Sequence, residues 1–247
     1  PTPAARPIEL KRLSDYVRPL VGTKGEGNTY PGPSAPFGML QLSPDTDKEL
    51  WETASGYEYS DPTIFGFSLT HLTGTGIPDL GDFLFVPQTG EPRLTSGTKG
   101  NADSGYLSGY SHAEETASAG YYKVTMQKSG TTVELTTGER AGMMRMTFPA
   151  SDRASILVDL QHVLSGKKWK VIWSHVRVED DSTVTGYHLV NGWAKERPLY
   201  FAARISRPFD TPEPFSDGKP AIYPTSRFAS ALEAAGTYLH LIATLPT

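Results

Sequence analysis

Short segments in which apolar and polar residues alternate recur along this chain, and they limit its possible folds more than any other feature. Residues 143–148 and 199–206 are the clearest examples. A period of two residues is typical of a β-strand that buries one face. Roughly a dozen strand-like segments, with few candidate helices between them, predict an all-β protein. We expect a large antiparallel β-sandwich of two sheets, with long loops and little helix.

The predicted strands are short apolar runs bounded by Pro, Gly or Asp. They lie at residues 37–43, 64–70, 82–87, 121–127, 131–137, 143–148, 156–160, 171–179, 183–190, 199–206 and 237–244. Lys128, Ser129 and Gly130 separate two of these runs and predict a hairpin turn. The longest loop is expected at residues 90–118, which are rich in Gly, Ser and Thr.

Length, cysteine content and charge exclude several classes of protein. The 247 residues fit one large β-domain or two small domains. Because the chain contains no cysteine, it has no disulfides, thiolate nucleophiles or cysteine-bound zinc. A net charge of -4 gives no electrostatic basis for binding nucleic acid. No apolar run approaches the roughly 20 residues that a membrane helix needs. The chain begins at Pro1 rather than Met, which indicates a processed or trimmed start.

The stretch between residues 55 and 87 concentrates polar groups that could carry a function. It contains Asp61, His71, Asp79 and Asp82, together with glycines that allow a positive φ or a close approach to a ligand. Proteins commonly place functional residues on such loops between rigid strands. Asp79 and Asp82 are weak candidates for binding Ca²⁺, which prefers oxygen ligands. The alternative is a set of turns in which the aspartates bond their own backbone.

Sugar binding has the strongest physical basis among the functions considered. The motifs G-x-S-x-G and H-E-x-x-H and a phosphate-binding loop are absent. Pyranose rings pack on aromatic faces, and their hydroxyls pair with charged planar groups. Trp51 lies in a polar loop near Glu58 and Asp61, and Trp193 lies in the charged loop NGWAKERP. Each tryptophan could instead be a packing anchor, and the two acidic residues could form a solvated loop face.

Several long motifs match one known family in the family's own order. They are GTKGEGNTYPGPSAPFGMLQLSPDT (22–46), SGYEYSD (55–61), GFSLTHLTGTGIPDLGDFLFVP (66–87), SAGYY (118–122), TTVELTTGERAGMMRMTFP (131–149) and GWAKERPLYFAARISRPF (192–209). The chain thereby resembles the amino-terminal region of glycoside hydrolase family 92, the calcium-dependent exo-α-mannosidases of bacteria. It departs from the family pattern at Glu58, where Gly-Tyr-His-Tyr is common, and at Leu69, where Ser-His-Thr-His is common.

The resemblance implies a two-domain enzyme that hydrolyses α-mannosides with inversion at the anomeric carbon. Residues 1–247 would be the single N-terminal β-sandwich domain. The (α/α)6 barrel, with the catalytic acid and base, would lie outside this chain. That helical domain would be the partner of this one and would supply most ligands of the Ca²⁺ ion. A secreted, cell-surface or periplasmic location in a bacterium is implied as well.

Substrate contacts within this chain are expected in its loops. Trp51 corresponds by position to a tryptophan that the family places near the sugar. The other candidates for substrate binding are Tyr57, Glu58, Asp61, His71 and Gly74. Two alternatives stay open: a free-standing, non-catalytic carbohydrate-binding β-sandwich, and a relative that cleaves mannosyl phosphodiesters. A domain that docks onto a partner should expose an apolar patch on one sheet face or around residues 22–36 and 66–82.

Overall fold

The computed structural model describes residues 12–47, 51–165, 170–210, 212–220, 233–236 and 239–246. Within these ranges the chain is built from β-strands, and its helical segments are four 3-10 helices of three or four residues. Every pairing between the strands is antiparallel, so the predicted all-β antiparallel fold is confirmed. No helix in the described ranges is both long and apolar enough to cross a membrane.

The secondary-structure elements are short, as the spacing of turn residues predicts. The strands are β1 (Ser43–Asp45), β2 (Thr63–Ile64), β3 (Gly66–Ser68), β4 (Leu84–Thr89), β5 (Ser108–Gly109), β6 (Thr116–Ser118), β7 (Tyr121–Met126), β8 (Thr131–Thr137), β9 (Gly142–Thr147), β10 (Ala154–Asp159), β11 (Lys170–Val178), β12 (Thr183–Asn191), β13 (Arg197–Arg204), β14 (Pro212–Ser216), β15 (Lys219–Pro220), β16 (Glu233–Gly236) and β17 (Leu239–Leu245). The 3-10 helices are η1 (Leu13–Tyr16), η2 (Gly25–Gly27), η3 (Trp51–Thr53) and η4 (His112–Glu114).

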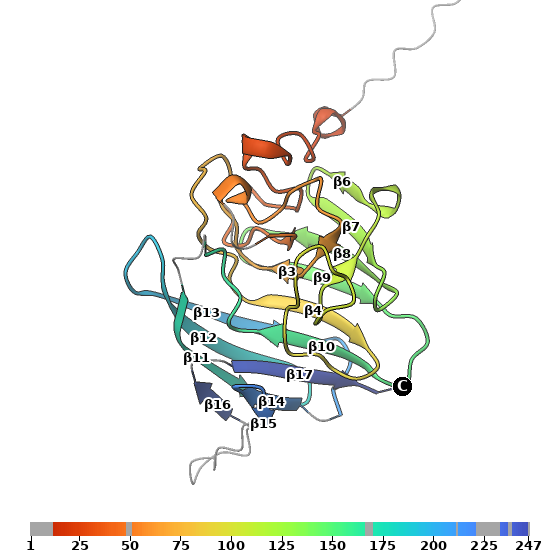
Figure 1. Cartoon of the computed structure of the whole chain (residues 1–247), viewed down its shortest axis with the longest axis vertical. Coiled ribbons are helices and arrows are strands. Elements are labelled where there is room, and N and C mark those ends of the chain that lie inside the picture. Colours follow the sequence, from red (N-terminus) through yellow and green to blue (C-terminus); the bar gives the residue numbers. More distant parts are fainter. Residues whose placement is uncertain are drawn as a thin grey trace, which may run out of the picture.

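A seven-stranded sheet crosses the middle of the molecule, in the order β1-β3-β4-β10-β17-β14-β15 (Figure 1). A four-stranded sheet, β13-β12-β11-β16, lies along it on one side, and a second four-stranded sheet, β6-β7-β8-β9, lies toward the end that carries β3. Strands β2 and β5 form a separate two-stranded pair. The fold is therefore a large sandwich extended by additional sheets.

The core follows from alternation along the central strands. Leu157 of β10 pairs with Ile242 of β17, and both point into an apolar cluster under the loop that contains Tyr106. The next pair, Val158 and Leu241, points to the opposite face and packs against β11 and β12. Burying each of these aliphatic side chains contributes on the order of 1.5–3 kcal/mol. Both faces of the central sheet are therefore buried.

A third cluster joins the β6–β9 sheet to the rest of the molecule. Tyr122 of β7 and Val133 of β8 are fully buried there together with Phe67 of β3. Leu69, directly after β3, packs against this cluster and also against the one between the central sheet and β11–β12. The segment that follows β3 is therefore held by two cores at once.

The structure differs from the prediction at residues 37–43 and 90–118 and agrees with it at the hairpin turn. Residues 37–43 were expected to form a strand, but Phe37 has a φ of +57°, which breaks an extended conformation. Within residues 12–42, the pairing consists of a single bridge from Gln41 to Ser34. The predicted hairpin is confirmed, because β7 and β8 pair around Gly130, whose φ of +66° suits glycine. The expected long loop at 90–118 contains β5, η4 and β6.

Candidate functional site

Three loops meet at Asn28. Its Oδ1 atom accepts a hydrogen bond of 3.1 Å from the backbone amide of Ala54, and its carbonyl oxygen accepts one of 2.6 Å from the amide of Gly74. Asn28 itself has a φ of +51°, a conformation that asparagine tolerates better than most residues. This single residue therefore fixes three loops against one another. We call the surface that they form the loop rim; it comprises residues 22–31, 51–61 and 70–82.

Trp51 begins η3 on the loop rim, and 38% of its surface is exposed. Two hydrogen bonds hold the residues after η3 to the first loop. The amide of Ala54 donates to Asn28, and the Ser55 hydroxyl donates to the carbonyl oxygen of Thr29 over 3.0 Å. The predicted sugar contact thus lies at the surface on an anchored segment. Contact between Trp51 and a sugar stays a prediction.

Tyr57 and Glu58 lie deeper than the sequence led us to expect. Tyr57 is 2% exposed, and its hydroxyl donates to a carboxylate oxygen of Glu115 over 2.8 Å. Glu58 is also buried, and its carboxylate accepts hydrogen bonds from the amide of Gly25 and from the amide and hydroxyl of Ser60. In this structure Tyr57 packs the core and Glu58 ties two loops together, so neither offers an open face to a sugar.

Asp61 pairs with a cation instead of facing solvent alone. Its carboxylate lies 2.9 Å from Nζ of Lys99, which also contacts Asp47. Burial raises the pKa of Asp61, and the ammonium group of Lys99 opposes that rise. The side chain is therefore part of a half-buried ion-pair group at the edge of the loop rim.

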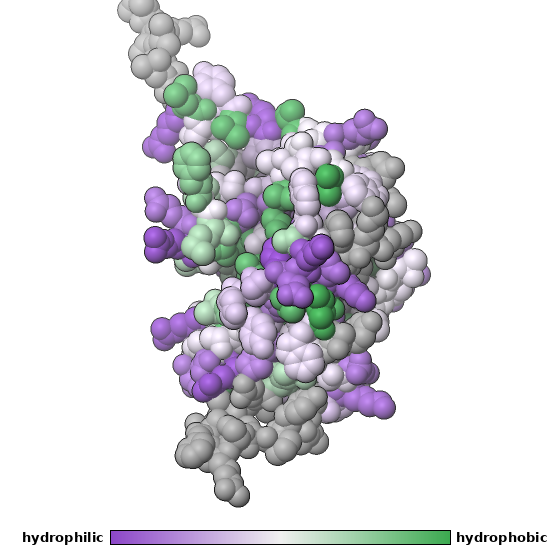
Figure 2. Space-filling view, turned by 90° about the vertical axis from the view of Figure 1, so that its left-hand side faces the viewer, coloured by the Kyte–Doolittle hydropathy of each residue, from purple (hydrophilic) through white to green (hydrophobic). Residues whose placement is uncertain are grey.

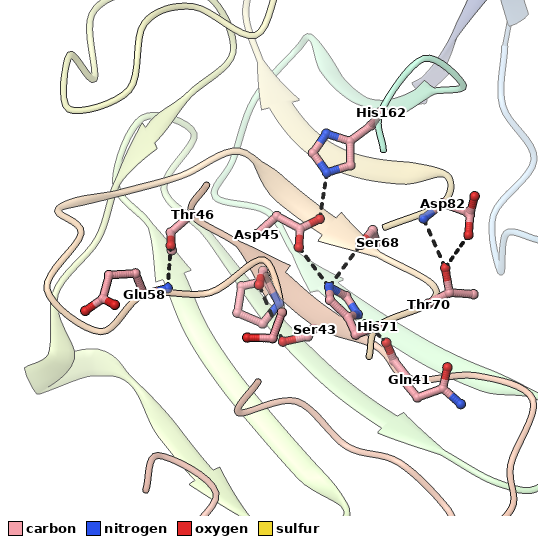
Figure 3. Close-up of polar contacts among 12 residues, drawn as sticks. Gln41, Ser43, Asp45, Thr46, Glu58, Ser68, Thr70, His71, Asp82 and His162 are labelled. Atoms are coloured by element: carbon pink, nitrogen blue, oxygen red, sulfur yellow. Dashed lines mark hydrogen bonds and ion pairs between the residues drawn. The ribbon is translucent and has the colours of Figure 1, made fainter. Parts of the chain in front are cut away.

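His71 lies in a buried polar group centred on Asp45 (Figure 3). Nε2 of His71 lies 2.8 Å from Oδ1 of Asp45, and Nε2 of His162 lies 2.8 Å from Oδ2 of the same carboxylate. Oγ of Ser68 lies 3.1 Å from Nε2 of His71. Burial raises the pKa of Asp45, but the two imidazoles more than offset this effect and lower the pKa to about 2. His71 belongs to the 70–82 loop but is buried, so it has a structural position, which was the alternative to sugar contact.

Gly74 lies on the loop rim with a φ of +71°. A Cβ atom at this position would have no heavy atom within 4 Å, so the backbone faces open space. Its amide hydrogen is already used by the carbonyl oxygen of Asn28. Gly74 therefore leaves room above the loop, and its sugar contact remains a prediction.

Asp79 and Asp82 both face the guanidinium group of Arg197. Oδ2 of Asp82 lies 2.7 Å from Nη1, and Oδ1 of Asp79 lies 3.4 Å from Nη2. Asp82 also bonds Nε2 of His188 at 2.8 Å. Burial raises the pKa of Asp82, and hydrogen bonds from His188 and Arg197 bring it down to about 2. Asp82 is therefore held as a carboxylate, and both aspartates contact the cationic guanidinium group of Arg197.

Calcium does not fit these two aspartates. A guanidinium already occupies the space that a divalent cation would need, and like charges repel. Across the described ranges no group of three or more His, Asp or Glu side chains could hold a metal ion. The alternative was that the aspartates bond the backbone of their own turn. Asp79 does so, because its Oδ1 accepts a hydrogen bond of 2.8 Å from the amide of Leu80.

Sequence reasoning missed the residues that organise this site. Asn28 could have been found from the sequence, because an asparagine next to a glycine in a loop often adopts a positive φ. Asp45 and His162 are 117 positions apart, and Arg197 lies 115 positions from Asp82, so no local motif connects them. Only the strand pairing brings these partners together.

Known proteins share the sequence pattern and the fold of this chain. A model of the glycosyl hydrolase family 92 N-terminal domain matches residues 16–244. The GH92 alpha-mannosidase BT3965 from Bacteroides thetaiotaomicron, solved in complex with mannoimidazole, is 50% identical, with a TM-score of 0.90 over 96% of this chain and 31% of its own. The GH92 glycosyl hydrolase ccman5 is 28% identical, with a TM-score of 0.74 over 94% of this chain and 30% of its own.

A curated relative adds one further match. An uncharacterized secreted glycosidase of Arthroderma benhamiae is 30% identical over 160 residues, which are 62% of this chain and 20% of that protein. The chain thus spans about a third or less of the length of these relatives. Because the family model matches nearly the whole chain, and half of the aligned residues are identical in a solved member, this chain belongs to glycosyl hydrolase family 92 as its N-terminal domain.

Proposed function

We propose that this domain is part of an exo-acting α-mannosidase and that its loop rim forms one wall of the pocket for the terminal mannose. The observation that carries the proposal is the 50% identity, over 96% of this chain, to an alpha-mannosidase that was solved with mannoimidazole. The partly exposed, anchored Trp51 suits such a wall, because pyranose rings pack on aromatic faces.

The catalytic acid and base would come from outside this chain. Inverting hydrolysis needs one carboxyl group that protonates the leaving oxygen and another that activates water. On the loop rim, Glu58, Asp61 and Asp79 are each committed to hydrogen bonds or ion pairs within the domain. We therefore assign the acid–base pair to an (α/α)6 helical domain, which would also hold the Ca²⁺ ion that the family resemblance implies.

An exposed apolar ridge supports the presence of that helical partner. Phe37 is fully exposed, and Met39 and Met143 are more than half exposed. The loop beneath Phe37 is anchored, since the amide of Gly38 bonds the carbonyl oxygen of Ala35 and the amide of Met39 bonds that of Glu139. Figure 2 shows apolar side chains projecting among charged ones on the upper half of the side that it faces. An exposed ridge of this kind fits a docking surface better than the surface of a free-standing lectin.

Secretion by a bacterium is the location that we propose for the whole protein. Its support is the relative named as a secreted glycosidase, together with the resemblance to bacterial mannosidases. Glycans with terminal α-mannose would then be met outside the cytoplasm.

The complete gene product tests this function directly. Mannose release from an α-linked mannobiose should be measured with and without a calcium chelator, and the anomer first released should be followed by NMR. We expect release of the β-anomer, loss of activity with chelator and recovery on adding Ca²⁺. A β-linked mannobiose is the control. If the hydrolysis rate is the same with and without the chelator, the calcium assignment is wrong. If the protein binds the sugar but does not hydrolyse it, the free-standing carbohydrate-binding alternative is favoured.

A further inference from the structure

The connection between β12 and β13 presents an exposed tryptophan on a fixed backbone. Trp193 is 60% exposed, yet its amide donates to Oδ2 of Asp79 over 3.1 Å. The preceding amide, of Gly192, donates to the carbonyl oxygen of Ala194 over 3.0 Å. A Cβ atom at Gly192 would lie 2.7 Å from Oδ1 of Asp79, so only glycine allows this close approach. The indole is therefore exposed, but its backbone is held in place.

Two residues with a strained backbone follow Asp79, the residue that holds the Trp193 amide. Leu80 and Phe83 both have a positive φ, +69° and +58°. Such conformations cost on the order of 1–3 kcal/mol each for residues of this type, and they persist where surrounding contacts enforce them. Here the enforcing contacts are the ion pairs of Asp79 and Asp82 with Arg197. Strain of this kind clusters where a protein preorganises a binding surface.

The same stretch reaches Trp51 at its other end. The amide of Gly74 bonds the carbonyl oxygen of Asn28, and the side chain of Asn28 bonds the amide of Ala54, three residues after Trp51. Both η3 and the β12–β13 connection lie on the left-hand side of Figure 1. One anchored stretch, residues 72–82, therefore fixes the backbones that carry two exposed indoles, at Trp51 and Trp193.

We propose that Trp193 is a second aromatic contact for the glycan and that it packs against a sugar unit beyond the one at Trp51. The ligand class is then an α-mannoside of at least two sugar rings. The side chains of Lys195 and Glu196 are exposed beside Trp193 and supply charged hydrogen-bonding groups for sugar hydroxyls. This proposal rests on the proposed function, because it names the substrate length for the same site.

The test compares two substrates in the complete protein, an α-linked mannotriose and α-mannosyl fluoride, which has one ring and no aromatic leaving group. Trp193→Ala should lower kcat/KM for mannotriose roughly two- to tenfold, the range of one aromatic contact, and leave the fluoride unchanged. Trp193→Phe should retain most of the activity on mannotriose. Trp173→Ala is the matched control, since Trp173 is another exposed tryptophan, on β11.

An equal fall with both substrates, or no fall with mannotriose, would overturn the role of Trp193. If the wild-type protein hydrolyses neither sugar, the proposed function fails instead. The same variants are then compared by calorimetric binding of mannotriose. Weaker binding in Trp193→Ala alone still supports the contact, and unchanged or absent binding removes it.

Discussion

Nε2 of His71 lies 2.8 Å from Oδ1 of Asp45, and neither side chain reaches solvent. The other ring nitrogen, Nδ1, lies 2.6 Å from the carbonyl oxygen of Gln41. A carbonyl and an ionised carboxylate can only accept, so both ring nitrogens have to donate, and the imidazole is a cation while Asp45 is charged. This buried ion pair fixes the segment from which the 72–82 stretch starts.

Acid should weaken the domain through Asp45. Its pKa is about 2 in the folded protein and 3.8 ordinarily, so folding favours the carboxylate. The stabilisation is fully present above about pH 4 and is lost as the pH falls toward 2; the shift corresponds to roughly 2–3 kcal/mol. The free energy of unfolding, measured by urea denaturation between pH 2 and 6, checks this.

A histidine variant isolates the contribution of Asp45 from those of other buried acids. His71→Gln removes the cation beside Asp45, so the acid-induced loss of stability should begin at higher pH. His175→Gln is the matched control, because His175 lies on β11 and stacks on Tyr187. An unchanged acid profile in His71→Gln would contradict the pairing.

Trp51→Ala should impair the complete enzyme without unfolding this domain. Removal of a partly exposed indole costs little packing, whereas the loss of one aromatic contact should lower kcat/KM roughly two- to tenfold. Steady-state kinetics on mannobiose and the thermal midpoint of the same variant separate the two effects. If kcat/KM is unchanged, Trp51 serves only packing.

Asn28 allows a test of the loop rim by hydrogen exchange. Asn28→Ala removes the acceptor for the Ala54 amide and places a Cβ-bearing residue without a polar side chain at a φ of +51°. Asn28→Gly removes the same acceptor but accepts the conformation without strain. We expect faster exchange of the Ala54 amide in both variants and of the Gly74 amide mainly in Asn28→Ala. Equal exchange at Gly74 in the two variants would show that strain plays no part.

The sequence predicts the strands well and the site only in outline. Alternation along β8 and β13 and the turn at Gly130 are local signals, so the antiparallel sheets could be expected from neighbouring residues alone. Neighbouring residues in the sequence do not indicate whether a polar side chain faces solvent or bonds a partner far away in the chain. Tyr57 was expected to contact sugar, but its hydroxyl bonds Glu115, 58 positions away. Trp51 is different, since 38% of its surface stays exposed, as a loop position predicts.

Arg197 should be indispensable for the 79–83 turn. Arg197→Met leaves Asp79 and Asp82 without their shared cation, and removal of one partner from a buried ion pair costs about 3–5 kcal/mol. Arg197→Lys should recover only part of this, because one ammonium cannot reproduce the two-armed contact of a guanidinium. Denaturant unfolding of both variants measures the difference. A lysine variant as stable as the wild type would show that charge alone is sufficient.

Phe37 gives opposite predictions for the isolated domain and the complete protein. In the 247-residue chain its ring is fully exposed and its φ is +57°, so Phe37→Gly loses no burial and relieves about 1 kcal/mol or more of backbone strain. The free energy of unfolding of the chain alone should therefore stay level or rise.

In the complete protein a helical partner would bury the ring, and the same substitution should lower the free energy of unfolding by on the order of 1.5–3 kcal/mol through lost packing. Phe37→Asn, which tolerates the conformation but lacks the ring, should behave likewise. Calorimetric unfolding of both forms decides the matter: a change of the same sign in each would mean that nothing covers Phe37 in the whole enzyme.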